Sequence, residues 1–70
     1  MSLLTPRQRE VAELIADSYT DKQIMALLEL SAAAVRCHID ALVGKMRLDR
    51  TRNLRVQIAG FIHETRARSA

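Results

Sequence analysis

Cysteine is nearly absent from this chain, since Cys37 is the only one among 70 residues. An internal disulfide is therefore excluded, and one thiol offers too few ligands for a structural zinc site. A reducing cytoplasm is the compartment that we expect. Charged residues interrupt the apolar stretches, and the N-terminus lacks both the basic and the apolar region of a secretory signal. We expect neither a membrane span nor a signal peptide.

Strand-like alternation, glycine-rich loops and internal repeats are also missing from the sequence. No nucleophile and base, and no two carboxylates, stand at a spacing typical of catalysis. His38 is a lone histidine on a partly apolar face, which is typical of a hydrogen-bonded packing residue rather than a metal ligand. The sequence therefore predicts no enzyme, and we expect no cofactor and no metal.

Positive charge is concentrated in the second half of the chain. Residues 1–35 contain three basic and five acidic residues, a balance of −2, whereas residues 36–70 contain eight basic and three acidic residues, a balance of +5. An arginine-rich half favours a polyanionic partner such as nucleic acid.

The chain is short enough for a single domain with one core. Helix start signals divide it into four segments. A capping hydroxyl followed three residues later by glutamine forms a capping box, and this pattern occurs at Thr5 with Gln8 and at Thr20 with Gln23. Ser31 can cap a third helix, and either Asp49 or Thr51 a fourth. We expect helices over about 6–17, 21–28, 32–46 and 52–66.

Apolar residues recur at helical spacing within each of these segments. The stripes that we expect to face the core are Val11, Leu14 and Ile15; Ile24, Leu27 and Leu28; Val35, Ile39, Leu42 and Met46; and Leu54, Ile58, Phe61 and Ile62. Gly44 is expected to permit a close helix approach. Val56, Ala59 and His63 form a partial second face on the last helix. The sequence thus predicts an all-α domain of four helices, with a tight turn joining the second to the third as in a helix-turn-helix.

A family resemblance rests on several short motifs in order. They are Leu4-Thr5-Pro6-Arg7-Gln8-Arg9-Glu10-Val11, Thr20-Asp21-Lys22-Gln23-Ile24, Leu30-Ser31, Val35-Arg36, His38, Lys45-Met46 and Leu48. In these motifs the chain resembles the LuxR/GerE-type DNA-binding domain of bacterial transcription regulators, from about Leu3 to Ile62. The resemblance implies a homodimer on double-stranded DNA, with the third helix in the major groove and the fourth helix joining the two copies. RNA polymerase is a further candidate partner.

The resemblance also implies roles for individual residues. Phosphate anchors fall on Thr20, Asp21 and Lys22, where a helix N-terminus also attracts anions. Base contacts fall on Arg36, Cys37 and Asp40, and the contacts between the two copies on Val56, Ala59 and His63. Lys45, Arg47 and Arg50 are expected to add phosphate contacts.

Two features depart from the family pattern on the third helix. Asp40 replaces a basic or amide residue, and phosphates would repel it unless it accepts from a cytosine amino group or pairs with an arginine. Ala32, Ala33 and Ala34 cannot hydrogen-bond a base, although their methyl groups can meet a thymine methyl. Arg36, which can hold guanine O6 and N7, is then the main direct reader of sequence.

Two other functions are compatible with the same sequence. The promoter-reading region of sigma factors opens with a similar Pro-Arg-Gln-Arg-Glu string, although it typically ends soon after its recognition helix. A protein-interaction module that keeps the fold but has lost DNA binding would explain the alanines and Asp40. The sequence also fits both a stand-alone regulator and a piece of a longer one.

Overall fold

Four α-helices make up the protein, which is described here over residues 4–69 of a computed structural model. They are α1 (Pro6–Ala16), α2 (Asp21–Leu28), α3 (Ala32–Met46) and α4 (Leu54–Ser69). Residues 4–69 contain no strand, and none of their helices is both long and apolar enough to cross a membrane. The predicted all-α, four-helix architecture is confirmed. Leu3, where the family resemblance begins, lies outside the described residues.

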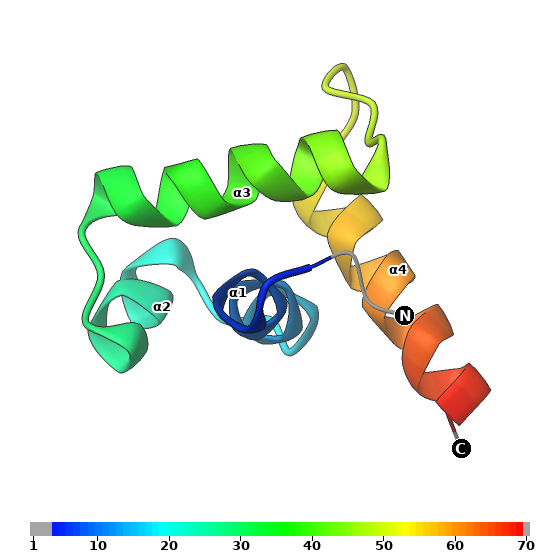
Figure 1. The fold of residues 1–70 in the computed structure, drawn as a ribbon, viewed down its shortest axis with the longest axis horizontal. Coiled ribbons are helices and arrows are strands. Elements are labelled where there is room, and N and C mark those ends of the chain that lie inside the picture. The colour runs from blue at the N-terminus through cyan, green and yellow to red at the C-terminus, as the bar shows by residue number, and fades with distance from the viewer. Residues whose placement is uncertain (1–3, 70) are drawn as a thin grey trace.

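The helices are arranged around α1. In Figure 1, α1 is seen nearly end-on at the centre, with α2 and α4 on opposite sides and α3 lying across the top. The main packing contacts join α1 to α4, α1 to α3, and α2 to α3. The α2–α3 pair, joined by residues 29–31, therefore forms a helix-turn-helix that rests on α1, and α4 supports α1 from the other side.

Local capping explains where the first three helices begin. Thr5 Oγ1 accepts a hydrogen bond from Gln8 N–H at 3.2 Å, Thr20 Oγ1 accepts from Gln23 N–H at 3.1 Å, and both glutamine side chains return a bond to the cap backbone. Both predicted capping boxes are therefore confirmed. Ser31 Oγ accepts from the N–H of the third residue of α3 at 3.1 Å, as predicted.

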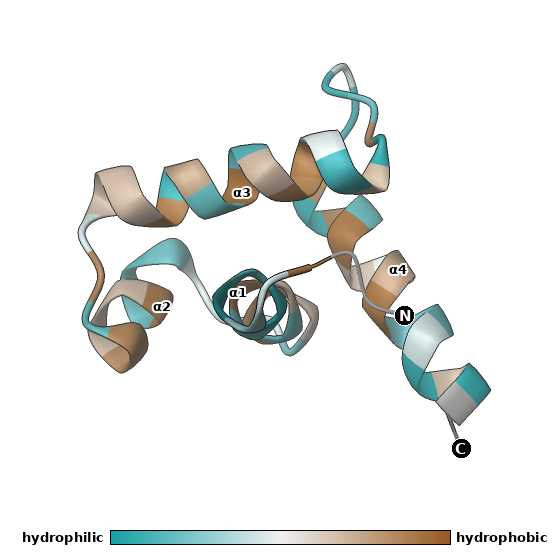
Figure 2. Cartoon of the chain, viewed as in Figure 1, coloured by the Kyte–Doolittle hydropathy of each residue, from teal (hydrophilic) through white to brown (hydrophobic). Residues whose placement is uncertain are grey.

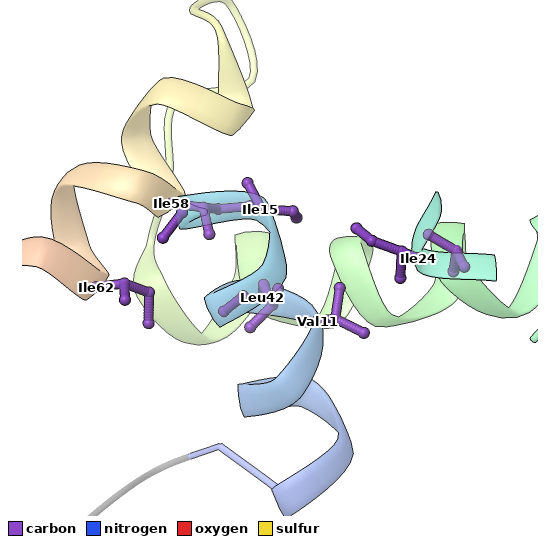
Figure 3. Packing of buried hydrophobic residues seen from close by; sticks show 9 residues of the cluster. Val11, Ile15, Ile24, Leu42, Ile58 and Ile62 are labelled. Carbon is purple, nitrogen blue, oxygen red and sulfur yellow. The ribbon is translucent and has the colours of Figure 1, made fainter. Parts of the chain in front are cut away.

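The core is built from aliphatic residues of all four helices. Its buried members are Val11, Ala12, Ile15, Ala16, Ile24, Val35, Leu42, Ile58 and Ile62. Figure 3 shows the labelled side chains of α1 in the middle, with Ile58 and Ile62 of α4 on one side and Ile24 of α2 on the other. No polar or charged residue is buried within residues 4–68. Apolar burial is therefore the main force that orients the helices.

The predicted start of α4 is wrong by two residues. Asn53 Oδ1 accepts from Val56 N–H at 3.2 Å, so Asn53 occupies the capping position. Asp49 instead accepts from the N–H of Thr51 at 2.9 Å and from its hydroxyl at 2.6 Å. These bonds close a local turn and lower the pKa of the Asp49 carboxyl. Asp49 and Thr51 therefore shape the α3–α4 loop, and α4 begins after it. Two helix ends also differ from the expectation: α1 ends one residue earlier, at Ala16, and α4 continues to Ser69.

Two apolar residues are more exposed than expected, and one glycine makes no close helix contact. Phe61 follows Ile58 by three residues at the edge of the buried stripe, and it is 44% exposed. Leu27, expected in the buried stripe of α2, is 57% exposed. Gly44 lies in the open, because a Cβ atom built on it would meet nothing within 4 Å. The expected close helix approach at Gly44 is therefore wrong, and this glycine belongs to the outer surface of α3.

Candidate nucleic-acid interface

The outer face of α3 is exposed over most of its length. Its buried residues are Val35, Leu42 and Val43, of which Val35 and Leu42 belong to the core cluster. The exposed positions are Ala32, Ala33, Arg36, Cys37, Asp40, Gly44 and Lys45. All three predicted base-contacting residues therefore lie on one exposed side of the helix. Figure 2 shows the first turn of α3 in the pale brown of its alanines, so the charged groups of this face begin only at Arg36.

A groove connects this face with the start of α2. It lies between α2, α3 and the beginning of α4, and its apolar lining residues are Met25, Ala32, Val35, Ile39 and Leu54. Its charged lining residues are Asp21, Arg36, Asp40 and Arg50. The tertiary structure thus brings together two predicted base contacts and two predicted phosphate contacts.

At the start of α2, backbone N–H groups are available to bind an anion, whereas the side chains of Thr20 and Asp21 already have partners. The hydroxyl of Thr20 already caps the helix, and the Asp21 carboxylate accepts from Arg55 at 2.6 Å. The first intrahelical bond to Thr20 O comes from Ile24 N–H, so the N–H groups of Asp21 and Lys22 have no intrahelical acceptor. Two backbone donors and the Lys22 ammonium group therefore form the anion-attracting part of this helix end.

Asp40 has an arginine partner. Its Oδ1 atom lies 3.6 Å from Nη1 of Arg50, and both side chains are more than half exposed. The sequence analysis allowed Asp40 to face DNA if it accepted from a cytosine amino group or paired with an arginine. The second of these conditions is met within the protein. The same contact means that Arg50, a predicted phosphate contact, is shared between Asp40 and any anion.

The other predicted phosphate contacts follow α3. Lys45 Nζ donates to the Gln8 side chain of α1 at 2.7 Å, and this neutral partner leaves the ammonium charge intact. Arg47 ends α3 in the left-handed conformation, with φ of 54°, and is exposed. Both cations lie beside the C-terminal end of α3, where a positive charge is also favoured by the helix dipole.

Arg55 is a residue that the sequence analysis missed. Its guanidinium donates to Asp21 Oδ1 and to the backbone carbonyl of Tyr19, so it joins α4 to the start of α2. A signal was present in the sequence, because Arg55 precedes Ile58 by three residues and Ile62 by seven. An arginine at those spacings lies near the inward side of a helix and needs an acceptor there.

Of the three α4 residues predicted to join two copies, two are exposed and one is half-buried. Val56 is 67% exposed, and His63, two turns further along, is exposed as well. Ala59 is half-buried and packs against the core. The outward face of α4 is therefore centred on Val56 and His63, with Ala59 at its edge.

Residues 4–69 contain no group of three or more histidine, cysteine or acidic side chains that could hold an ion. His38 is half-buried on α3, and Cys37 is exposed with a free thiol. The chemistry of the exposed face is therefore that of guanidinium, ammonium and carboxylate groups beside small apolar side chains.

Comparison with known proteins identifies the family. The profile described as "Bacterial regulatory proteins, luxR family" matches residues 2–58. The nitrate/nitrite response regulator protein NarL of Escherichia coli strain K12 is 33% identical over 63 residues, which cover 90% of this chain and 27% of NarL; NarL of an O6:H1 strain gives the same values. The chain thus spans about a quarter of the length of these curated relatives. No solved structure matches significantly. The chain belongs to the luxR family of bacterial regulatory proteins.

Proposed function

We propose that this chain binds double-stranded DNA sequence-specifically, as a homodimeric transcription regulator of the bacterial cytoplasm. The observation that carries the proposal is the groove in which Arg36 and Asp40 of α3 meet Asp21 at the start of α2. A helix in the major groove reads base edges, while a neighbouring helix N-terminus binds the phosphate backbone. Both kinds of contact are available on one side of this molecule.

Base reading falls mainly on Arg36. Its side chain is exposed at the second turn of α3 and has no ion-pair partner within the described residues. A guanidinium placed there can hold guanine O6 and N7 through two hydrogen bonds. Cys37 and the alanines before it add small apolar contacts suited to a thymine methyl.

Phosphate binding uses the cations that no carboxylate neutralises. Among the described residues, the basic side chains without an ion pair are Lys22, Arg36, Lys45, Arg47 and Arg52. Arg7, Arg9, Arg66 and Arg68 are paired with acidic residues away from α3. The unpaired cations lie on α2, α3 and the α3–α4 loop, which are the elements that face the proposed DNA.

Pairing of two copies through α4 completes the proposal. Val56 presents a large exposed apolar side chain on α4, and His63, which is also exposed, lies two turns further along the helix. A two-fold symmetric contact would bring the same residues of both copies together and set the spacing of two half-sites. RNA polymerase is the protein partner that we expect for such a regulator.

A second candidate function is a protein-interaction module. Its supporting observations are the three alanines at the start of α3 and the Asp40–Arg50 pair, which together reduce the charge available to DNA. Such a module would use the fold and α4 without binding duplexes.

Selection of random duplexes by the 70-residue protein, sequenced at two salt concentrations, tests the proposal. We expect an enriched palindrome whose affinity falls with salt, because bound phosphates release counterions. Arg36→Glu should abolish enrichment, whereas Arg68→Glu changes the net charge equally at the far end of α4 and should retain it. Salt-dependent binding without enrichment would contradict sequence specificity, and absence of binding would favour the interaction module.

A further inference from the structure

Arg55 connects two helices that otherwise have little contact. It lies in the first turn of α4, and its guanidinium reaches Asp21, the first residue of α2, and the carbonyl of Tyr19 just before it. The main packing contacts of α4 are with α1, and those of α2 are with α3. Arg55 therefore supplies a polar link from α4 to the start of the helix-turn-helix.

The position of Asp21 makes this link relevant to anion binding. Its carboxylate is 62% exposed and lies beside the N–H groups of Asp21 and Lys22. An acidic side chain in the first turn stabilises a helix, but it occupies the same positive end that a phosphate would approach. An unpaired Asp21 would repel that phosphate, whereas the Arg55 guanidinium cancels its charge.

We propose that Arg55 is a positioning residue for DNA phosphate binding at the start of α2. Its bond to Asp21 removes the repulsion between this carboxylate and a phosphate, and its second bond, to the Tyr19 carbonyl, holds the guanidinium beside Asp21. The inference rests on the proposed DNA binding and assigns to Arg55 no direct contact with DNA. A direct phosphate contact by Arg55 is the competing role, and the two roles differ in the effect of removing Asp21.

Four variants separate these roles: Arg55→Ala, Asp21→Asn, the double variant Arg55→Ala/Asp21→Asn, and Arg66→Ala. Arg66 is a matched control, because it is another α4 arginine bonded to an aspartate, Asp17, at 2.9 Å with similar exposure. Affinity for one duplex is measured at fixed salt, together with the Tm of each variant. Arg55→Ala should weaken binding about fivefold to tenfold, as expected for an uncovered like charge near a phosphate.

The double variant gives the decisive result. With the carboxylate gone, its affinity should return to within about threefold of the Asp21→Asn variant. Arg66→Ala should change affinity far less than Arg55→Ala, even where both lower the Tm. Equal losses in the two arginine variants, or a double variant as weak as Arg55→Ala, would overturn the role of Arg55 while leaving DNA binding intact. A wild-type protein that binds no duplex would overturn both proposals.

Discussion

Asp40 of α3 and Arg50 of the α3–α4 loop form an ion pair, with 3.6 Å between Oδ1 and Nη1. The pair joins the acidic position of the proposed recognition face to a cation that could otherwise bind phosphate. Because both side chains are more than half exposed, the pair contributes little to stability. We therefore expect its main effect to be on how strongly the proposed recognition face attracts DNA.

Removing the charge of Asp40 should strengthen general DNA binding. In Asp40→Asn, Arg50 is released to bind one more phosphate, so the plot of log affinity against log salt should become steeper by about 0.9. Titrations of an arbitrary duplex at several salt concentrations measure this slope. Glu64→Gln, which releases Arg68 at the far end of α4, is the control and should leave it unchanged. A loss confined to the selected duplex would instead show that Asp40 contacts a base.

Arg36 should contribute to specificity. Arg36→Ala is expected to cost about 1–3 kcal/mol on the selected duplex and to relax the preference at one base pair. Binding to a set of single-base variants of that duplex measures both effects. Arg7→Ala, on the exposed side of α1, is the control. An equal loss on every duplex would mean that Arg36 holds a phosphate only.

Val56 is the best position at which to test pairing of two copies. Val56→Glu should raise the dimer Kd by about tenfold or more, because two carboxylates would meet across a two-fold axis. Since Val56 is 67% exposed, the fold itself should be unaffected. Sedimentation analysis measures the dimer, and Leu27→Glu at the 57% exposed position on α2 is the matched control. Ala59 is a poorer test, because it packs against the core.

The end of α2 stores strain that glycine should relieve. Glu29 has φ of 54° and ψ of 45°, a left-handed conformation that disfavours residues with a Cβ atom. Glu29→Gly should therefore raise the free energy of unfolding by about 0.5–1 kcal/mol. Urea denaturation measures the change. Ala26→Gly, in the middle of the same helix, should have the opposite sign and lower it by about 1 kcal/mol.

Stability in acid should depend on Asp17. The hydrogen bond from Arg66 lowers the pKa of the Asp17 carboxyl below its ordinary value of 3.8. Because the folded pKa is the lower one, the stabilisation is present above pH 3.8 and is lost as pH falls towards the folded value. Asp17→Asn should flatten the dependence of Tm on pH between about pH 5 and about pH 3. An unchanged acid slope would contradict this role for the Asp17–Arg66 pair.

Much of the fold could be read from the sequence because its signals are local. The capping boxes at Thr5 and Thr20 join residues three apart, and the aliphatic stripes repeat at the period of the helix. The start of α4 was harder to predict, since Asp49, Thr51 and Asn53 are all capable caps. The turn that Asp49 closes on Thr51 decided between them.

The sequence by itself determined four helices, their apolar sides and an exposed set of candidate contacts on the third. Only the tertiary structure decided the partners of Asp21, Asp17 and Lys45, because these bonds join residues far apart in the chain. Arg55 meets Asp21 across 34 residues, Lys45 meets Gln8 across 37, and Arg66 meets Asp17 across 49. Such contacts follow from how α3 and α4 pack on α1, and burial of aliphatic side chains sets that packing without regard to charge.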